Sequence, residues 1–353
     1  MKYLYTVIIV FSLFSCSDIT KHSPSSLFSQ IHDLKKISSN FDEDSFGRIE
    51  GMQSNDSTLI IFDYHSENSF SLFDIQTEKL IGRFGTIGQG PGEIPLGCVG
   101  YIDNDNFCIF YDVIGLVAKF QIDSLKFNIK RQPTRLPKYQ IDKLYLSKIA
   151  LINDSILFGA GTYNSRFQFI LFDKNNTVID YNVEIFNANE NKFNEHHKYL
   201  SNQGNLTKNP SVDKFAYVIN YSSNLDIIEV VNNKIRLVKS LRFRNPNSSP
   251  FNRGELFGVI PDKNSAIGYI DISSGEKYIY ALYTDKKMVE SNGNRNHFNS
   301  NIILVFDWEG NPIKKLILEK EAYYISVNEK SNELFSAIIT EDGYWNIDRY
   351  KLH

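Results

Sequence analysis

The stretch Ile-Gly-Arg-Phe-Gly-Thr-Ile-Gly-Gln-Gly-Pro-Gly-Glu-Ile, residues 81–94, holds four glycines and a proline within eight positions. Glycine permits backbone conformations that other residues avoid and proline fixes its own, so the stretch predicts a sharply shaped loop. An alternating run at 71–75 precedes it, and another strand-like run begins near Val99. This order of strands and a glycine-rich corner recurs in weaker form to the end of the chain.

Six pairs of strand-like runs, each with Asn, Asp, Gly or Ser turn residues, follow one another along the chain. The pairs are 58–63 with 69–75, 107–112 with 116–122, 156–160 with 167–173, 215–220 with 225–231, 278–283 with 302–307, and 334–340 with 345–352. No window of twelve residues predicts an amphipathic helix, and the partial exceptions, 140–146 and 190–200, are short and polar.

The ends of the second runs come into register at Phe73, Phe120, Phe172, Ile228, Phe306 and Tyr350, which are 47, 52, 56, 78 and 44 residues apart. A four-stranded unit that recurs every 40 to 50 residues is typical of propeller blades. We therefore predict an all-β, six-bladed β-propeller with four-stranded antiparallel blades over residues 45–353. We expect residues 46–52 to close the ring by pairing with strands of 325–352.

Composition supports a packed β-structure with its core distributed over the blades. Hydrophobic residues make up 42% of the 353 residues, and 26 Phe and 20 Tyr stand against 3 Met. Aromatic side chains fit a pleated sheet surface. The net charge of -3 provides no basic field, which excludes nucleic acid as the expected partner.

The N-terminus has the form of a signal peptide. Lys2 precedes an apolar run at 4–14 that is too short to cross a bilayer as a stable helix. The run ends in Leu-Phe-Ser-Cys (13–16), which resembles the lipobox of bacterial lipoproteins, although Phe14 departs from the small or aliphatic residue usual there. The resemblance implies cleavage after residue 15 and lipidation of Cys16. The alternative is a buried N-terminal strand.

We accordingly expect a signal peptide at 1–15 and a lipidated Cys16 followed by a tether at 16–44. The lipid would make the membrane a partner, and Asp18 close behind the cysteine favours the outer membrane of a bacterial envelope. Cys98 and Cys108 flank a turn, so they either form a cross-strand disulfide or are two small buried residues.

The glycine corner, G-x-x-G-x-G-P-G-E at 85–93, resembles the corner of the TolB-like six-bladed propeller lipoproteins of Bacteroidetes. The run Phe-Asp-Trp-Glu-Gly-Asn-Pro at 306–312 resembles their D-W-x-G turn. The resemblance extends from about residue 45 to the C-terminus. It implies the propeller fold and an envelope location, and it implies no reaction.

Each motif that suggests chemistry also has a structural interpretation. The amides of the glycine corner could bind a phosphate, but the corner has no P-loop lysine and opens no helix, so we interpret it as a link between blades. Glu195, His196 and His197 lack metal-ligand spacing, so we expect a solvated loop and no metal or cofactor. Asp63 and Asp112 close equivalent strands and are expected to accept hydrogen bonds from turn amides. The alternative is that several such carboxylates ring a channel mouth and bind a cation.

Aromatic and charged residues at strand ends are the candidate ligand contacts. They are Tyr64, His65, Arg83, Tyr111, Asp112, Tyr163, Arg166, Tyr221 and Tyr283. The long polar segment 286–300 is expected to be disordered or ordered by a partner.

No nucleophile elbow and no catalytic set is recognisable from spacing. We therefore expect a lipid-anchored binding module for an envelope protein, glycan or peptide. A glycan- or peptide-directed hydrolase or lyase, with its site at the central channel, is the alternative, and a scaffold within an envelope complex is a third possibility.

Overall fold

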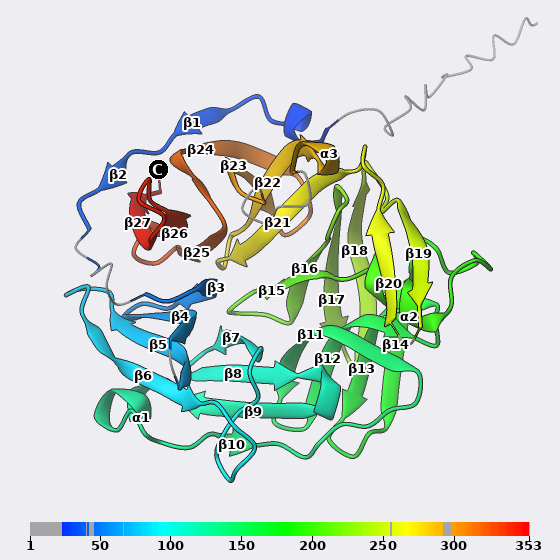
Figure 1. The fold of residues 1–353 in the computed structure, drawn as a ribbon, viewed down its shortest axis with the longest axis horizontal. Coiled ribbons are helices and arrows are strands. Elements are labelled where there is room, and N and C mark those ends of the chain that lie inside the picture. Colours follow the sequence, from blue (N-terminus) through cyan, green and yellow to red (C-terminus); the bar gives the residue numbers. More distant parts are fainter. Residues whose placement is uncertain are drawn as a thin grey trace, which may run out of the picture.

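The computed structural model of this protein describes residues 23–39, 41, 46–65, 67–254, 256–291 and 298–352. Its strands form six blades around a central axis (Figure 1). The prediction of an all-β six-bladed propeller is therefore confirmed. The predicted signal peptide and Cys16 lie outside the described residues.

Each blade runs from an inner strand at the axis to an outer strand at the rim. The first blade comprises β3 (Ile49–Ser54), β4 (Thr58–His65), β5 (Asn68–Asp74) and β6 (Leu80–Thr86). The second comprises β7 (Val99–Asp103), β8 (Asn106–Tyr111), β9 (Leu116–Gln121) and β10 (Thr134–Arg135). The third comprises β11 (Leu144–Asn153), β12 (Ile156–Tyr163), β13 (Phe167–Asp173) and β14 (Val178–Glu184).

The fourth blade comprises β15 (Gly204–Lys208), β16 (Lys214–Ile219), β17 (Asn224–Val231) and β18 (Lys234–Arg242). The fifth comprises β21 (Ala266–Ser274), β22 (Tyr278–Lys287), β23 (Ser300–Asp307), β24 (Pro312–Ala322) and β1 (Ile31–Asp33), which is parallel to β24. The sixth comprises β25 (Tyr324–Asn328), β26 (Glu333–Ile339), β27 (Trp345–Lys351) and β2 (Lys36–Ile37).

All six predicted hairpins are present as the second and third strands of the six blades. The six residues that we aligned at the ends of the third strands are each at most 2% exposed. They share burial because each third strand is covered on both faces by a neighbouring blade. Residue spacing alone was therefore sufficient to identify the repeating unit.

The hydrophobic core is divided into six clusters, and each cluster lies between two adjacent blades. The cluster that contains Ile61 and Phe335 joins the first blade to the sixth. A single blade cannot cover both faces of its own sheet, and ring closure buries the two faces that would otherwise remain exposed.

The predicted strand for ring closure is wrong. Residues 46–52 do not pair with the last blade, because β3 pairs with β4 as the inner strand of the first blade. The chain closes the ring further upstream, where β2 pairs with β27. Figure 1 shows β1 and β2 running along the outside of the blades that contain β24 and β27. Part of the segment that we expected to be a tether thus belongs to the propeller.

Short elements fill the longer connections. They are η2 (Pro24–Leu27), η4 (Asp112–Ile114), α1 (Ile122–Phe127), α2 (Glu195–Ser201), α3 (Met288–Ser291) and the hairpin of β19 (Ser248–Arg253) and β20 (Leu256–Pro261). The hairpin explains part of the 78-residue spacing before the fifth blade's third strand. Within the segment 286–300, β22 and α3 extend to Ser291, and residues 292–297 lie outside the described residues. No helix in the described part of the chain is long and apolar enough to cross a membrane.

Candidate functional site

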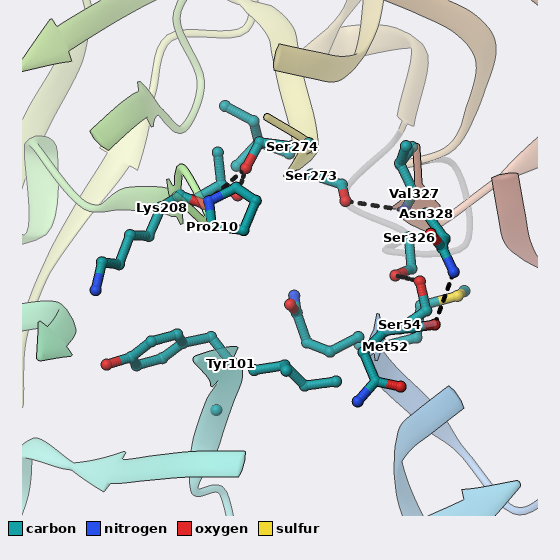
Figure 2. Close-up of a pocket in the computed structure, with 18 of the residues that line it drawn as sticks. Met52, Ser54, Tyr101, Lys208, Pro210, Ser273, Ser274, Ser326, Val327 and Asn328 are labelled. Atoms are coloured by element: carbon teal, nitrogen blue, oxygen red, sulfur yellow. Dashed lines mark hydrogen bonds between the residues drawn. The ribbon is translucent and has the colours of Figure 1, made fainter. Parts of the chain in front are cut away.

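A cavity of about 650 Å³ lies on the axis of the propeller. The inner strands of all six blades line it, and so do turns between first and second strands, such as 55–57 and 275–276. The cavity therefore opens on the face that carries these turns. Figure 2 shows Tyr101 and Lys208 on one side of the open space and Ser54, Ser273 and Ser326 on the other.

Hydrogen bonds between neighbouring blades hold the cavity wall in place. Ser54 Oγ lies 2.8 Å from Ser326 Oγ, which joins the first and sixth blades. The backbone N–H of Val327 donates to Ser273 Oγ at 3.0 Å and joins the sixth and fifth blades (Figure 2). Buried polar groups need such partners, and the partners fix the side chains that line the cavity. The cavity is thus formed before any ligand arrives.

Lys208 ties three blades together at one side of the cavity. Its Nζ donates to Asp103 Oδ1 at 3.1 Å and to the carbonyl oxygen of Leu151 at 2.8 Å. The backbone N–H of Leu151 in turn donates to the hydroxyl of Tyr101 at 2.5 Å. The ammonium group of Lys208 is therefore satisfied by the protein itself, and we assign it a structural role.

Lys148 and Asp271 are two charged groups of the cavity wall whose pKa values are shifted by burial. Burial lowers the pKa of the Lys148 ammonium, and the nearby carboxylate of Asp271 opposes that effect. Burial raises the pKa of Asp271 to about 7, although backbone amides of Ile325 and Ile272 and the charge of Lys148 favour its ionised form. The two charges interact, but no ion pair within contact distance joins them among the described residues. Desolvated titratable groups that converge in a cavity are typical of functional sites.

Both residues follow an irregularity in an inner strand. The register of β11 against β12 shifts between Leu146 and Lys148, and that of β21 against β22 shifts between Tyr269 and Asp271. Such a bulge inserts an extra residue and re-aims the side chains beside it. The hydroxyl of the intervening Ser147 bonds away from the axis, to the carbonyl oxygen of Ala160 at 3.0 Å.

This pair was not predicted from the sequence, for a physical reason. A charged residue within a strand-like run is normally interpreted as facing solvent, and neither bulge has a signature in the sequence. A usable signal is a charge in the first strand of a propeller blade, because those strands face the axis.

The structure brings none of the nine predicted contact residues to the cavity. They lie at or near the opposite ends of the strands, in the first five blades, and ligand contact by them stays a prediction. Tyr283 is fully buried and its hydroxyl lies 3.0 Å from Ser223 Oγ. Arg166 forms an ion pair with Glu184. Tyr163 packs on Tyr181 with 5.3 Å between ring centroids.

The other candidates are spread over the same face. The ring of Tyr221 packs on that of Phe298 at 6.1 Å between centroids. Arg83 lies in β6, at the rim, and Tyr111 ends β8. For Tyr64 and His65 the structure describes the backbone of β4 alone.

Asp112 links the second and third blades. Its carboxylate accepts from the hydroxyl of Tyr139 at 2.6 Å and from the backbone N–H of Leu146 at 3.3 Å, while burial raises its pKa. Asp63 accepts from the backbone N–H of Gly47 at 2.7 Å. Both carboxylates accept from backbone amides, but the donors are Leu146 in β11 of the next blade and Gly47 ahead of β3. Among the described residues, the predicted donors, the amides of the turns that follow Asp63 and Asp112, are therefore wrong.

The glycine corner connects β6 to the second blade and supplies its own anion. Glu93 Oε2 accepts from the backbone N–H of Gly90 at 2.7 Å. A Cβ at Gly88 would lie 2.0 Å from the same oxygen, so the carboxylate fills the concave side of the loop. The structural interpretation of the corner is favoured, because a phosphate would have to displace this carboxylate.

The predicted loop at Glu195 is helical, since residues 195–201 form α2. His197 is 3% exposed, and its Nε2 lies 3.0 Å from Asn252 Oδ1, whereas the ring of His196 packs near Tyr145. Across the residues that the structure describes, no three His, Cys, Asp or Glu side chains gather as metal ligands. Cys98 and Cys108 are free and buried, and burial raises the pKa of each thiol to about 12.

Comparisons with known proteins agree with this architecture. The profile of TolB-like 6-blade propeller-like proteins matches residues 48–330. A Bacteroides fragilis protein that was assigned as exported superposes with a TM-score of 0.56 at 14% identity, over 94% of this chain and 96% of that one. Hydrazine synthase of Kuenenia stuttgartiensis gives a TM-score of 0.45 at 9% identity, over 89% of this chain and 98% of that one. No curated protein matches the sequence.

Proposed function

The chain belongs to the TolB-like six-bladed propeller family, and from that premise we propose that it is a lipid-anchored envelope protein that binds a small polar ligand in its axial cavity without converting it. The cavity is the observation that carries the proposal. Its volume of about 650 Å³ falls within the range of ligand sites, and residues from every blade reach it.

The pre-formed wall favours binding. Cross-blade hydrogen bonds, such as that of Thr207 Oγ1 with Ser274 Oγ at 2.7 Å, fix side chains that would otherwise have to be ordered by the ligand. A site that is ordered in advance loses less conformational entropy when it binds.

The envelope location is proposed from the N-terminus. The lipobox-like residues 13–16 support an acyl anchor at Cys16, and Asp18 favours the outer membrane. The similar Bacteroides fragilis protein was assigned as exported, which agrees with an envelope location.

Such an anchor would also orient the propeller. Ser23 follows Cys16 by seven positions, and its hydroxyl donates to Asp285 at 2.6 Å. A chain of that length spans at most about 25 Å. Asp285 lies near the end of β22, on the face opposite the cavity mouth. The anchored protein would then present its cavity away from the membrane surface.

The test is to incubate membrane-extracted protein with the low-molecular-mass fraction of envelope extract, remove unbound compounds and identify what is retained by mass spectrometry. The control variant is Gln53→Trp, which fills the cavity and removes no described hydrogen bond. We expect a compound that wild type retains, that Gln53→Trp does not retain, and that is recovered with its mass unchanged. Equal retention by both proteins, or none by either, would overturn the cavity proposal.

A second candidate function is the hydrolase or lyase predicted as the alternative. The convergence of Lys148 and Asp271 in the cavity favours it, since shifted pKa values are typical of acid and base groups. This function would be established in place of simple binding if a compound were recovered with an altered mass from wild type. The mass should then be unchanged when the side chain of Lys148 or Asp271 is replaced.

A further inference from the structure

We infer that Lys148, Asn205 and Asp271 form a subsite for the carboxylate of a small hydroxy or amino acid, the class that includes sugar acids and amino acids. This inference rests on the proposed binding function of the cavity and names its ligand class. The three residues come from the inner strands of three consecutive blades, β11, β15 and β21, and all three line the cavity.

Lys148 is the cavity lysine whose ammonium group has no contacting anion among the described residues. Three lysines line the cavity. Lys208 is bonded to Asp103, and Lys330 forms an ion pair with Asp56 at 3.2 Å. In the described part of the chain, no hydrogen bond or ion pair within contact distance holds the Nζ of Lys148. A desolvated ammonium without a contacting anion is unfavourable, so an anionic ligand group would supply the missing partner.

Asp271 supplies the complementary acceptor. The backbone N–H of Ile325 donates to its Oδ2 at 2.9 Å, which fixes the carboxylate in the cavity wall. It stands close enough to Lys148 for their charges to interact, yet it does not contact the ammonium. A ligand whose carboxylate meets Lys148 would therefore place a neighbouring hydroxyl or ammonium donor toward Asp271.

Asn205 lies on the inner strand of the intervening blade. Its Nδ2 donates to the carbonyl oxygen of Ile270 at 3.0 Å, and Ile270 is the residue at the bulge before Asp271. This bond fixes the carboxamide and leaves its oxygen to accept from the ligand. The three side chains thus offer one cation and two acceptors, a pattern that suits an acid with adjacent donors and not a purely anionic group such as phosphate.

The experiment measures binding to the full-length, detergent-extracted protein by isothermal titration calorimetry with two matched pairs of compounds. D-glucuronate is compared with D-glucose, which lacks the carboxylate, and L-serine is compared with ethanolamine, which lacks it likewise. We expect one of the two acids to bind at least roughly tenfold more tightly than its match. Which acid binds distinguishes a sugar acid from an amino acid.

Variants then locate the subsite. Lys148→Met retains the length of the side chain without its charge and should weaken acid binding by roughly tenfold or more, and Asp271→Asn should weaken it as well. Lys330→Met, at the mouth of the same cavity, should leave binding unchanged. If neither acid binds wild type, if each acid and its match bind equally, or if Lys148→Met binds as wild type does, the inference is overturned.

Failure here is distinguishable from failure of the proposed function. A compound from envelope extract that Gln53→Trp fails to retain, together with no binding of either acid, would leave the cavity proposal standing and refute this ligand class. If no extract compound is retained and neither acid binds, both the cavity proposal and this ligand class are refuted.

Discussion

The Nζ of Lys36 lies 2.5 Å from Oδ1 of Asp348. Lys36 belongs to β2, at the rim of the sixth blade, and the carboxylate of Asp348 in the neighbouring β27 is fully buried. This ion pair joins the first part of the described chain to its last strand. The N-terminal segment therefore closes the sheet of the last blade and also neutralises a charge inside it.

Lys36→Met should destabilise the protein by about 3 kcal/mol, because removal of one partner leaves a buried carboxylate without a compensating charge. Thermal unfolding measures the effect. The double variant Lys36→Met/Asp348→Asn should regain most of the loss, and Lys330→Met, which removes an exposed ion pair with Asp56, should change stability by less than about 1 kcal/mol. A Lys36→Met melting temperature equal to that of wild type would refute this role.

Gly92→Ala should disrupt the glycine corner. Gly92 has a φ of 80°, and a Cβ there would lie 2.4 Å from Cδ of Gln132. Gly343, with a φ of 86°, has no atom within 4 Å of such a Cβ. Gly343→Ala therefore measures the backbone term alone, about 1 kcal/mol, and Gly92→Ala should cost about 1 to 3 kcal/mol more because of the steric conflict. Equal losses in urea unfolding would show that the side chain of Gln132 simply moves aside.

Asp271 predicts a pH-dependent stability. Its pKa rises from 3.8 to about 7 in the folded protein, so the folded state holds the proton more tightly than the unfolded chain does. The stabilisation is complete below pH 3.8 and is lost as the pH rises toward 7. Asp271→Asn cannot lose this stabilisation, because its side chain does not titrate. Its melting temperature relative to wild type should therefore rise by a few degrees between pH 5 and pH 9. The stabilisation that wild type can lose over the whole titration is at most about 4 kcal/mol. A constant difference between Asp271→Asn and wild type across the same range would contradict the shifted pKa.

The sequence was sufficient for the repeating part of the fold and insufficient for the site. Residues such as Phe73 and Tyr350 could be aligned because burial repeats once per blade and leaves a spacing in the sequence. Ring closure was assigned to the wrong segment because β2 is only two residues long, which is too short for any periodicity. Lys148 and Asp271 come from different blades, lie beside bulges and interact only through their charges, and none of these relationships is encoded in local spacing.

A lipid anchor at Cys16 would bring the two faces of the propeller to different distances from the membrane. Val289, 53% exposed in α3, and the exposed Glu276, at the mouth of the cavity, both belong to the fifth blade and lie on opposite faces of the propeller. Each can be replaced by cysteine and labelled, because Cys98 and Cys108 are buried. We expect energy transfer to an acceptor dye in the lipid to be stronger from Val289→Cys than from Glu276→Cys, since Ser23, seven positions after Cys16, bonds to Asp285 on the face that carries Val289.

Cys16→Ala in either background should abolish the transfer, which ties the orientation to the anchor. Transfer of equal strength from both labels would mean that the short spacer does not hold the propeller in one orientation. Stronger transfer from Glu276→Cys would place the cavity mouth against the membrane and would favour a lipid-derived ligand over a soluble one. The comparison is informative because both labels sit on one blade, so a difference between them reports the tilt of the whole propeller and not the position of a single loop.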